Sequence, residues 1–463
     1  MKIAYLFSRY PVISHTFCDT EMLALENLGV SIEVASIHPP WTSLRHEHAA
    51  RLKAEIVYAP PAAVLKLLEK NAKSDKRWPG ELVASHEKKY GVDFKPALRC
   101  RNALYFADRF AREGIGHVHV HFANRAAHTA LFLKAMSGIR FSVTAHGQDF
   151  MTDLGSDELL REICHEAEFV AAETEFSKKL LAEKCPESVG KLVRVYNGMD
   201  LGNFPHAPPN ETGNPPRILS VGRLIEFKGF HDLIAACAEL KSRDISFVCE
   251  IGGEGPWRAK LEAQIDAAGV RDCVRLLGML SQAQVFARMR EADIFALACI
   301  SDAAGATDVF PTVILEAMAN ARPIVSTRLA GVPEMVDQEK NGFLVEPGDI
   351  HGLADSLEKL LESPELRREF GNAARAKIEN EFQSSHTVSR LKALFDEHAN
   401  TPNEKSRDRV AATRFACLLA EWPAPEMPRL DRELLELKRE FASMPIFVCK
   451  TPRNIPDNRE TLQ

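Results

Sequence analysis

The chain contains the stretch DVFPTVILEAMANARPIVST at residues 308–327, in which a helix-like segment, 311–320, leads into a short apolar run, 323–327. Another apolar run, DIFALACI (293–300), precedes it, so the order is strand, helix, strand. Strands that alternate with helices form parallel sheets with crossover helices. This part of the chain therefore predicts an α/β domain.

The same alternation occurs on both sides of a break. Residues 204–217, FPHAPPNETGNPPR, contain five prolines, which is typical of a linker. We expect strands before it at 2–8, 31–37, 117–123, 141–147, 169–174 and 192–198, and after it at 217–223, 247–253, 273–279, 293–300 and 323–327. The sequence predicts two doubly wound, Rossmann-like parallel-sheet domains, whose ligands bind in the cleft at the carboxyl ends of the strands.

Three ranges follow from this division. The first domain covers 1–205 and includes a mainly helical, proline-containing insertion at about 40–112. The second domain covers 206–384. Residues 385–463 are expected to form a helix and a tail that pack back on the first domain, with a further helix-like segment at 430–444.

Composition excludes several classes of protein. The chain has 463 residues, 45% of them hydrophobic and 26% charged, as in ordinary globular proteins. No apolar run is long enough to span a membrane, and residues 1–17 do not resemble a signal peptide. The ten cysteines form no CxxC pair, so we expect reduced core thiols in a cytoplasmic protein. We also expect no nucleic-acid partner.

Positive charge is concentrated at 61–112, which holds twelve Lys/Arg and six Asp/Glu residues. Such a segment can contact an anionic membrane surface or a phosphate-bearing partner. It can also be an ordinary solvated helical face. The sequence leaves both interpretations open.

The stretch at 308–327 also carries the strongest chemical signal. We expect Pro311 at the first position of the helix, whose N-terminal end favours an anion. Asp308 precedes that helix and Glu316 lies on it, so the two carboxylates can accept hydrogen bonds from the hydroxyl groups of a sugar. The alternative is a solvated aspartate and an exposed glutamate without a ligand.

Four further motifs in the second domain add to this signal. SVGRLIEFKGF (220–230) offers Gly222 for close backbone approach, and Arg223 and Lys228 as cations for a diphosphate. IGGEGPW (251–257) is a glycine-rich turn that does not fit GxGxxG. AGVPEMV (330–336) precedes EKNGFLVEPGD (339–349), which we interpret as an Asn-Gly hairpin.

Histidines occur on two expected strands of the first domain. His117, His119 and His121 alternate along one strand, a pattern that fits core packing better than a metal site. His121 can also face the cleft. His146 follows the strand at 141–145, so we predict that it lies in the cleft.

Together these motifs resemble the nucleotide-sugar glycosyltransferases of family 4, which have the GT-B fold. The resemblance covers roughly 1–395 and rests on VYNGMDLGNF (195–204), VGRLIEFKGF, IGGEGP, the paired-acid helix and PEMV followed by NGFLVEPGD. The opening segments PVISHTFCDTE (11–21), HVHVHFA (117–123) and FSVTAHGQDF (141–150) are similar to the subgroup that builds exopolysaccharide or lipopolysaccharide, of the colanic-acid type.

The resemblance implies a role for each matching residue. The first domain would bind the acceptor and the second the nucleotide sugar. Arg223 and Lys228 would bind the donor diphosphate, and Glu316 the ribose hydroxyls. Asp308 and backbone N–H groups of this turn would hold the sugar and phosphates, while His146 would lie near the reacting sugar. The remaining donor-binding positions implied are Gly222, Gly253, Leu277 within the base-binding segment 275–280, Phe310, Pro311 and Thr312.

The family transfers sugars with retention of configuration, and the resemblance implies neither a metal nor another cofactor. One departure is Asp308, where the family usually has glutamate, so the sugar contact and the donor preference are in doubt.

The function expected is transfer of a hexose from a UDP- or GDP-sugar to a surface polysaccharide or a lipid-linked, for example polyprenyl-linked, saccharide at the inner face of the membrane. The main alternative is a protein that binds a nucleotide sugar without transferring it. A dinucleotide oxidoreductase is disfavoured because the first strand has no GxGxxG after it, and other GT-B enzymes, such as epimerases or phosphorylases, should lack the paired acids.

Overall fold

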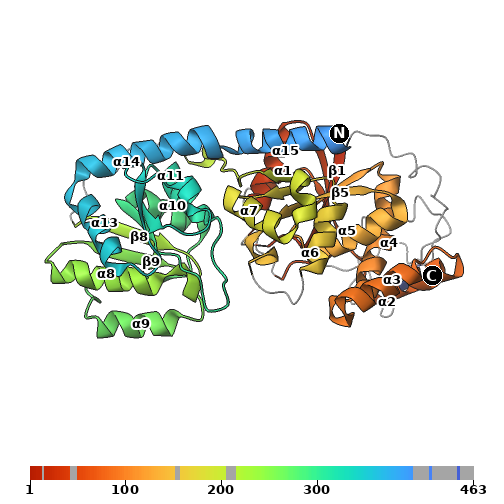
Figure 1. Ribbon diagram of the computed structural model, residues 1–463, viewed down its shortest axis with the longest axis horizontal. Helices are drawn as coiled ribbons and strands as arrows, with labels where there is room; N and C mark the ends of the chain where they lie inside the picture. Colours follow the sequence, from red (N-terminus) through yellow and green to blue (C-terminus); the bar gives the residue numbers. More distant parts are fainter. Residues whose placement is uncertain are drawn as a thin grey trace, which may run out of the picture.

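The computed structural model describes residues 1–12, 15–41, 50–151, 157–204, 215–399, 417–419 and 446–448. Two α/β domains lie side by side, and the last long helices run along one side of both (Figure 1). Each domain is built on one parallel sheet, of seven strands in the first and six in the second. The predicted pair of doubly wound sheets is confirmed.

The sheet of the first domain has the order β3-β2-β1-β4-β5-β6-β7. Its strands are β1 (Lys2–Arg9), β2 (Ser31–His38), β3 (Glu55–Tyr58), β4 (His117–His121), β5 (Arg140–Ala145), β6 (Val170–Ala172) and β7 (Leu192–Arg194). Its helices are α1 (Thr16–Asn27), α2 (Ala62–Ser74), α3 (Gly80–Tyr90), α4 (Pro96–Arg112), α5 (Arg125–Ser137), α6 (Glu158–Glu166) and α7 (Glu175–Lys184).

Both faces of this sheet are covered, which explains why β1 is apolar along most of its length. Along β1, Ile3 and Tyr5 belong to a core that includes side chains of α1 and α15 (Ser384–Ala399). Ala4 and Leu6 belong to the opposite core, with α4 and α5. Since successive side chains of a strand point to opposite faces, a strand buried on both faces has no polar face.

The segment at 40–112 departs in part from the prediction. It is mainly helical, as expected, but it also contains β3, which pairs in parallel with β2 at the edge of the sheet. The strand has only four residues, EIVY, and prolines follow it, so its sequence signal is weak. Residues 42–49 of this segment lie outside the described part.

The sheet of the second domain has the order β10-β9-β8-β11-β12-β13. Its strands are β8 (Arg217–Val221), β9 (Val248–Gly252), β10 (Val274–Gly278), β11 (Ile294–Leu297), β12 (Ile324–Thr327) and β13 (Gly342–Val345). Its helices are α8 (Phe230–Ser242), α9 (Arg258–Ala267), α10 (Gln282–Glu291), α11 (Thr312–Ala319), α12 (Val332–Met335), α13 (Ile350–Glu362) and α14 (Pro364–Lys377).

The predicted Asn-Gly hairpin is wrong. Gly342 instead begins β13, a sixth parallel strand that pairs with β12. The Asn341 side chain is buried and is used for a loop: its carboxamide accepts from the Asp337 N–H at 2.8 Å and donates to the Met335 carbonyl at 3.1 Å. Gly342 is required for packing, because a Cβ there would overlap the Ile324 carbonyl oxygen.

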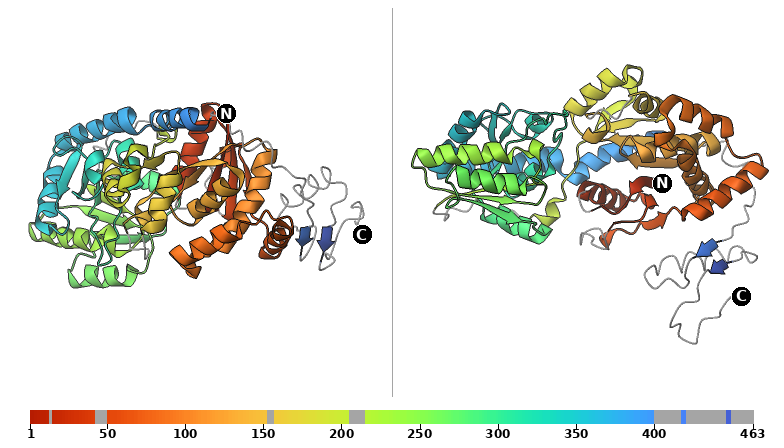
Figure 2. Two further views of the ribbon diagram at one scale, coloured as in Figure 1. Left: turned by 45° about the vertical axis from the view of Figure 1, so that its right-hand side comes forward. Right: turned by 90° about the horizontal axis from the view of Figure 1, so that it is seen from below.

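The end of the described chain returns to the first domain. A π-helical turn (Ile378–Phe382) follows α14. The backbone of Met199 bonds to Phe382 and Ser384, the residues on either side of Gln383. From there α15 packs against α1, as the views in Figure 2 also show. The expected helix at 430–444 lies outside the described residues, whereas the short strands β14 (Cys417–Leu419) and β15 (Ile446–Val448) pair in parallel.

The structure describes the side chains of eight of the ten cysteines, and all eight are free thiols. Among the described residues, no helix has the length and apolar character needed to cross a membrane.

Candidate functional site

The strand order of the second domain brings the predicted donor-site motifs to one place. The order reverses between β8 and β11, which are hydrogen-bonded neighbours. Gly222 and Lys228 follow β8, and Asp308 follows β11. Ligands of doubly wound sheets bind at such a reversal, beside the carboxyl ends of the strands.

The turn that carries Lys228 is fixed against the end of β11. The Ile300 N–H donates to the Phe227 carbonyl at 2.9 Å. Gly229 has a φ of +67°, and a Cβ there would overlap the Ala298 carbonyl oxygen. Glycine at this position therefore allows the close contact that holds Lys228 in place.

We expect Gly229→Ala to lower the free energy of unfolding by about 3 kcal/mol, because backbone strain and overpacking combine. Gly114 is a matched control: its φ is also +67°, but a Cβ there has no neighbour within 4 Å. Gly114→Ala should cost only about 1 kcal/mol. Urea unfolding followed by circular dichroism tests the difference, and equal losses in the two variants would contradict this role for the contact.

Lys228 and Asp308 form an ion pair, with side chains 12% and 20% exposed. Burial alone would lower the pKa of Lys228, but Asp308 outweighs it and the pKa lies above its ordinary value. A Cβ on Gly222 would lie 3.3 Å from Lys228 Cε, so the glycine leaves room for this side chain. Arg223 is exposed on the same turn. The structure thus brings Gly222, Arg223, Lys228 and Asp308 together. Lys228 and Asp308 are already paired with each other.

The glycine-rich turn after β9 packs directly on the turn after β8. The Gly222 N–H donates to the Gly252 carbonyl at 3.0 Å, and the Leu224 N–H to the Glu254 carbonyl at 2.9 Å. Gly253 has a φ of +144°, and a Cβ there would overlap the Gly222 carbonyl oxygen. Gly253 therefore supports the Gly222 turn through backbone packing.

The helix predicted to carry Glu316 is α11, and it begins one residue later than expected. Thr312 is its first residue, and Pro311 is the N-cap in an extended conformation rather than the first helical position. Proline at the cap leaves no N–H to satisfy there. Phe310, just before it, is buried and stacks on Tyr196 with ring centroids 5.8 Å apart.

Glu316 is half-buried on α11, rather than fully exposed. Among the described residues, no hydrogen bond or ion pair to its carboxylate is found. Burial raises its pKa to about 7. A carboxylate that is desolvated without a protein partner is typical of a functional site.

Leu277 lies on β10, which is separated from β8 by β9. At the end of β10, Gly278 has a φ of +78°, and Leu280 packs close to Gly252. The proposed base-binding segment thus lies at the same sheet edge as Lys228, with one strand between them.

His146 is buried at the end of β5 in the first domain. Its ring bonds to His121 (Nε2 to Nδ1, 3.0 Å) and to Glu173 (Nδ1 to Oε2, 3.2 Å). Burial would lower the pKa of His146, but Glu173 outweighs it and the pKa lies above its ordinary value. The Asn197 amide donates to the same Glu173 oxygen at 2.9 Å.

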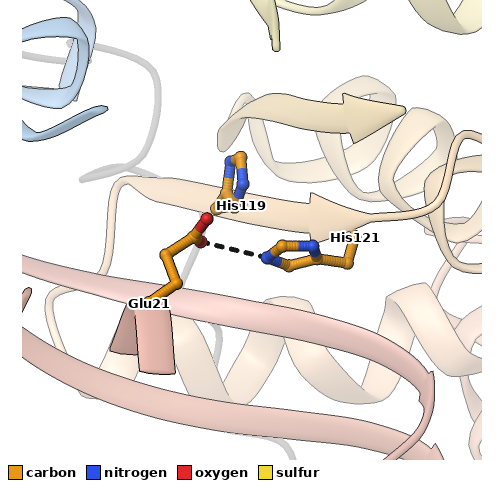
Figure 3. A group of neighbouring side chains, drawn as sticks. All are labelled: Glu21, His119 and His121. Atoms are coloured by element: carbon orange, nitrogen blue, oxygen red, sulfur yellow. Dashed lines mark hydrogen bonds and ion pairs between the residues drawn. The ribbon is translucent and has the colours of Figure 1, made fainter. Parts of the chain in front are cut away.

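The three histidines of β4 are all buried, and two of them come close to Glu21 of α1 (Figure 3). His121 Nε2 lies 3.0 Å from Glu21 Oε1. His119 bonds to Ser142 and Thr144 through its two ring nitrogens. Since every ring nitrogen of His119 and His121 has a protein partner, these residues form a hydrogen-bond network rather than a set of open metal ligands.

Glu334 joins the two domains, a role that the motif AGVPEMV did not reveal. It comes from α12, and its carboxylate accepts from the Glu175 N–H at 2.8 Å and the Phe176 N–H at 3.0 Å. These groups begin α7 of the first domain, so Glu334 caps that helix from the other domain. The Tyr196 hydroxyl donates to it at 3.0 Å.

A second contact brings the predicted residues of the two domains close together. A Cβ on Gly147 would lie 2.6 Å from Val309 Cγ2. Gly147 follows His146, and Val309 follows Asp308. The structure therefore places the expected acceptor-side histidine at the interface beside the Asp308 turn.

We expect Glu334→Ala to loosen the contact between the two domains, because the N–H groups of Glu175 and Phe176 would lose their acceptor, at a cost of about 1 kcal/mol. Small-angle X-ray scattering should show a larger radius of gyration at unchanged helix content. Glu346→Ala, which removes an exposed carboxylate of the same domain, is the control. A radius of gyration that stays unchanged in both variants would refute the proposal that Glu334 holds the two domains together.

Comparisons with known proteins agree with this geometry. The family described as "Glycosyl transferases group 1" matches residues 204–377. The amylovoran biosynthesis glycosyltransferase AmsK of Erwinia amylovora is 30% identical over 421 residues, which cover 86% of this chain and 99% of AmsK. The chain belongs to the group 1 glycosyltransferases.

Other relatives of this glycosyltransferase support the same assignment. WcaL of Escherichia coli (strain K12), whose name refers to colanic acid biosynthesis, is 27% identical over 85% of this chain and 99% of its own. The Anabaena protein Alr3699/HepE, solved in complex with UDP, superposes with a TM-score of 0.65 at 17% identity, covering 86% of this chain and 100% of its own. The structural match confirms the predicted GT-B fold.

Proposed function

We propose that this protein is a retaining glycosyltransferase of family 4 that transfers a hexose from a UDP- or GDP-sugar to a surface-polysaccharide or polyprenyl-linked saccharide acceptor. The names of AmsK and WcaL, which refer to exopolysaccharides, support the acceptor class. The second domain would bind the donor and the first the acceptor. We assign no metal or other cofactor to the reaction.

The observation that carries the proposal is the Lys228–Asp308 ion pair at the strand reversal of the second domain, together with the carboxylate of Glu316, unpaired among the described residues, on the helix that follows Asp308. Lys228 and Arg223 would bind the diphosphate, and Glu316 would accept hydrogen bonds from the ribose. The solved structure of HepE with UDP supports a nucleoside diphosphate as ligand. Cations at the diphosphate also stabilise the charge that develops as the nucleotide leaves.

Retention implies that the new bond forms on the face of the sugar from which the nucleotide leaves. The bond from the anomeric carbon to the diphosphate breaks, and a bond to the acceptor oxygen replaces it. The acceptor proton passes to the departing phosphate oxygen. His146, next to the Asp308 turn at the domain interface, would orient the reacting sugar.

Thermal unfolding with a panel of nucleotides and nucleotide sugars tests the proposal. A ligand at about 100 times its dissociation constant stabilises the protein by roughly 2.7 kcal/mol. We expect UDP or GDP to raise the melting temperature of the unmodified protein, and to have little effect on Glu316→Ala. Stabilisation of both proteins to the same extent would place the nucleotide elsewhere.

A nucleotide-sugar-binding protein without transferase activity is the second candidate, because Asp308 is shorter than the family's usual glutamate and is engaged by Lys228. Binding of the donor without turnover of the donor across a panel of acceptors would identify it. Asp308→Glu should then restore turnover.

We further propose a peripheral contact with an anionic membrane at the cytoplasmic face, through the exposed lysines of the 61–112 segment. About half of the basic residues there pair with acids, for example Arg101 and Lys73 with Glu69. Lys66, Lys70, Lys76, Lys88 and Lys95 are exposed. Sedimentation with anionic liposomes tests this contact, and no binding even at low salt would refute it.

A further inference from the structure

A second group of basic side chains lies at the carboxyl edge of the first domain's sheet. Arg9 ends β1 and His38 ends β2, and the two residues are partners in the register of these strands. Arg125 begins α5, directly after β4, which pairs with β1 on its other side. The strand order reverses between β1 and β4, so these residues surround the first domain's own ligand-binding position.

The fourth member, Arg99, is buried on α4, the helix that packs against α5. It is only 4% exposed, and its Nε has no hydrogen-bond partner among the described residues. Burial, and after it the charge of Arg125, lower the pKa of Arg99 to about 10. A buried cation without a counter-charge is costly to the fold, so such a residue needs a functional reason.

The basic groups around Arg99 add further positive charge. Burial and the charges of Arg9, Arg99 and Arg125 lower the pKa of His38. Among the described residues, no carboxylate pairs with any of the three arginines. Arg9 donates to the Pro39 carbonyl and lies 4.5 Å from the centroid of the exposed Trp41 ring.

The N-terminal end of α5 contributes to the same field. Its N-cap, Asn124, does not cap the helix with its side chain. The side chain donates to Asp149 instead, and the other Asp149 oxygen accepts from the Ala123 and His146 N–H groups. The positive end of a 13-residue helix therefore points to the same edge as the arginines.

We propose that Arg9, Arg99 and Arg125 bind an anionic group of the acceptor, either a phosphate or a carboxylate. This inference rests on the proposed function, because it takes the first domain as the acceptor domain. Guanidinium groups bind both kinds of anion through paired hydrogen bonds. A phosphate would come from a lipid-linked saccharide diphosphate, and a carboxylate from an acidic sugar. In both cases the acceptor is negatively charged, and the arginines hold it while His146 lies at the reacting end.

Calorimetric titration with inorganic pyrophosphate, glucuronate and glucose tests the proposal. The protein carries Arg223→Ala and Lys228→Ala, so that the donor site cannot bind the phosphate probe. We expect pyrophosphate or glucuronate to bind, and glucose not to bind. Pyrophosphate alone would indicate the lipid diphosphate, and glucuronate alone an acidic sugar. Binding of neither anion would overturn the inference.

Added substitutions locate the anion. Arg125→Gln and Arg9→Gln should each weaken its binding about tenfold or more. Lys179→Gln removes an exposed, equally charged residue of α7 and should have no effect. Equal affinity in the Arg125→Gln and Lys179→Gln proteins would overturn the assignment. Because Arg125 is exposed, its loss should not impair folding.

Arg99→Met gives an independent measurement. If the buried guanidinium is kept for an anion, its removal should raise the melting temperature of the ligand-free protein and abolish anion binding. A lower melting temperature with unchanged anion binding would instead make Arg99 structural and contradict its role here. Neither experiment uses nucleotide or measures transfer, so a failure of the proposed donor chemistry would appear separately, in the nucleotide titration.

Discussion

Replacing Glu316 by glutamine is expected to stabilise the ligand-free protein at pH 8 while greatly weakening nucleotide binding. Burial raises the pKa of this carboxyl group to about 7, and no described residue pairs with it. An unfolded chain ionises the group near its ordinary value of 4.5. Between these two values the unfolded state loses the proton while the folded state keeps it, so stability falls as the pH rises towards 7.

The size of the effect follows from the same shift. Each pKa unit corresponds to about 1.4 kcal/mol. The full shift would amount to about 3 kcal/mol, and partial exposure of Glu316 reduces this to about 2 kcal/mol. Glutamine cannot ionise, so the variant should lack this loss above pH 7. Melting temperatures at pH 5 and pH 8 measure it, with Glu346→Gln as an exposed control.

Nucleotide binding should change in the opposite direction. A hydrogen bond from a ribose hydroxyl to an ionised carboxylate contributes about 1.5–3 kcal/mol, whereas one to a neutral amide contributes about 0.5–1.5 kcal/mol, and Glu316 would accept two of them. We therefore expect UDP or GDP to bind about 10- to 100-fold more weakly to Glu316→Gln at pH 8. In the unmodified protein, affinity should fall as the pH drops below 7. An identical pH profile in the two proteins would exclude Glu316 from the ribose site.

Much of this arrangement could be predicted from sequence because the motifs follow strands. Parallel strands share one carboxyl edge, so residues just after β8 and β11 must lie close together. Lys228 and Asp308 are eighty positions apart, yet strand order alone makes them neighbours. The alternation of elements predicted the two sheets for the same reason, and it missed short strands such as β3 and β13.

Side-chain partners from different elements could not be predicted in this way. The bond between His146 and Glu173 depends on how the loops after β5 and β6 are oriented. The contact between Glu334 and α7 depends on how the two domains meet. At the Asn-Gly pair, 341–342, the sequence instead predicted a feature that the structure lacks, a hairpin turn. A strong local turn signal was overridden, because the Asn341 side chain is used inside the loop and Gly342 is needed for a close strand contact.

The pair of Lys228 and Asp308 leads to the second large expected effect. In the absence of a donor, Asp308 pairs with Lys228, the cation that would bind the diphosphate. Nucleotide binding must then displace Asp308, which becomes free to contact the sugar. Asp308, which is shorter than the family's usual glutamate, would in this case stay paired with Lys228 until the donor binds.

This scheme predicts opposite results for the two partners. Lys228→Met should weaken UDP or GDP binding about 100-fold, because the diphosphate loses a largely buried cation. Asp308→Asn should make the ligand-free protein about 2 kcal/mol less stable, since Lys228 is left buried without its counter-charge. The same variant should bind the nucleotide more tightly than the unmodified protein, because nothing competes for Lys228.

Calorimetric titration of each variant with UDP and GDP separates these outcomes, with Lys340→Met as an exposed control of equal charge change. The double variant measures the coupling between the two residues. If Asp308 competes with the diphosphate, removing it has no further effect once Lys228 is gone. If Asp308→Asn weakens nucleotide binding as much as Lys228→Met does, competition is refuted, and Asp308 acts on the nucleotide directly. Asp308→Glu would then separate pairing with Lys228 from contact with the sugar, because the longer glutamate can reach a bound sugar while it still pairs with Lys228.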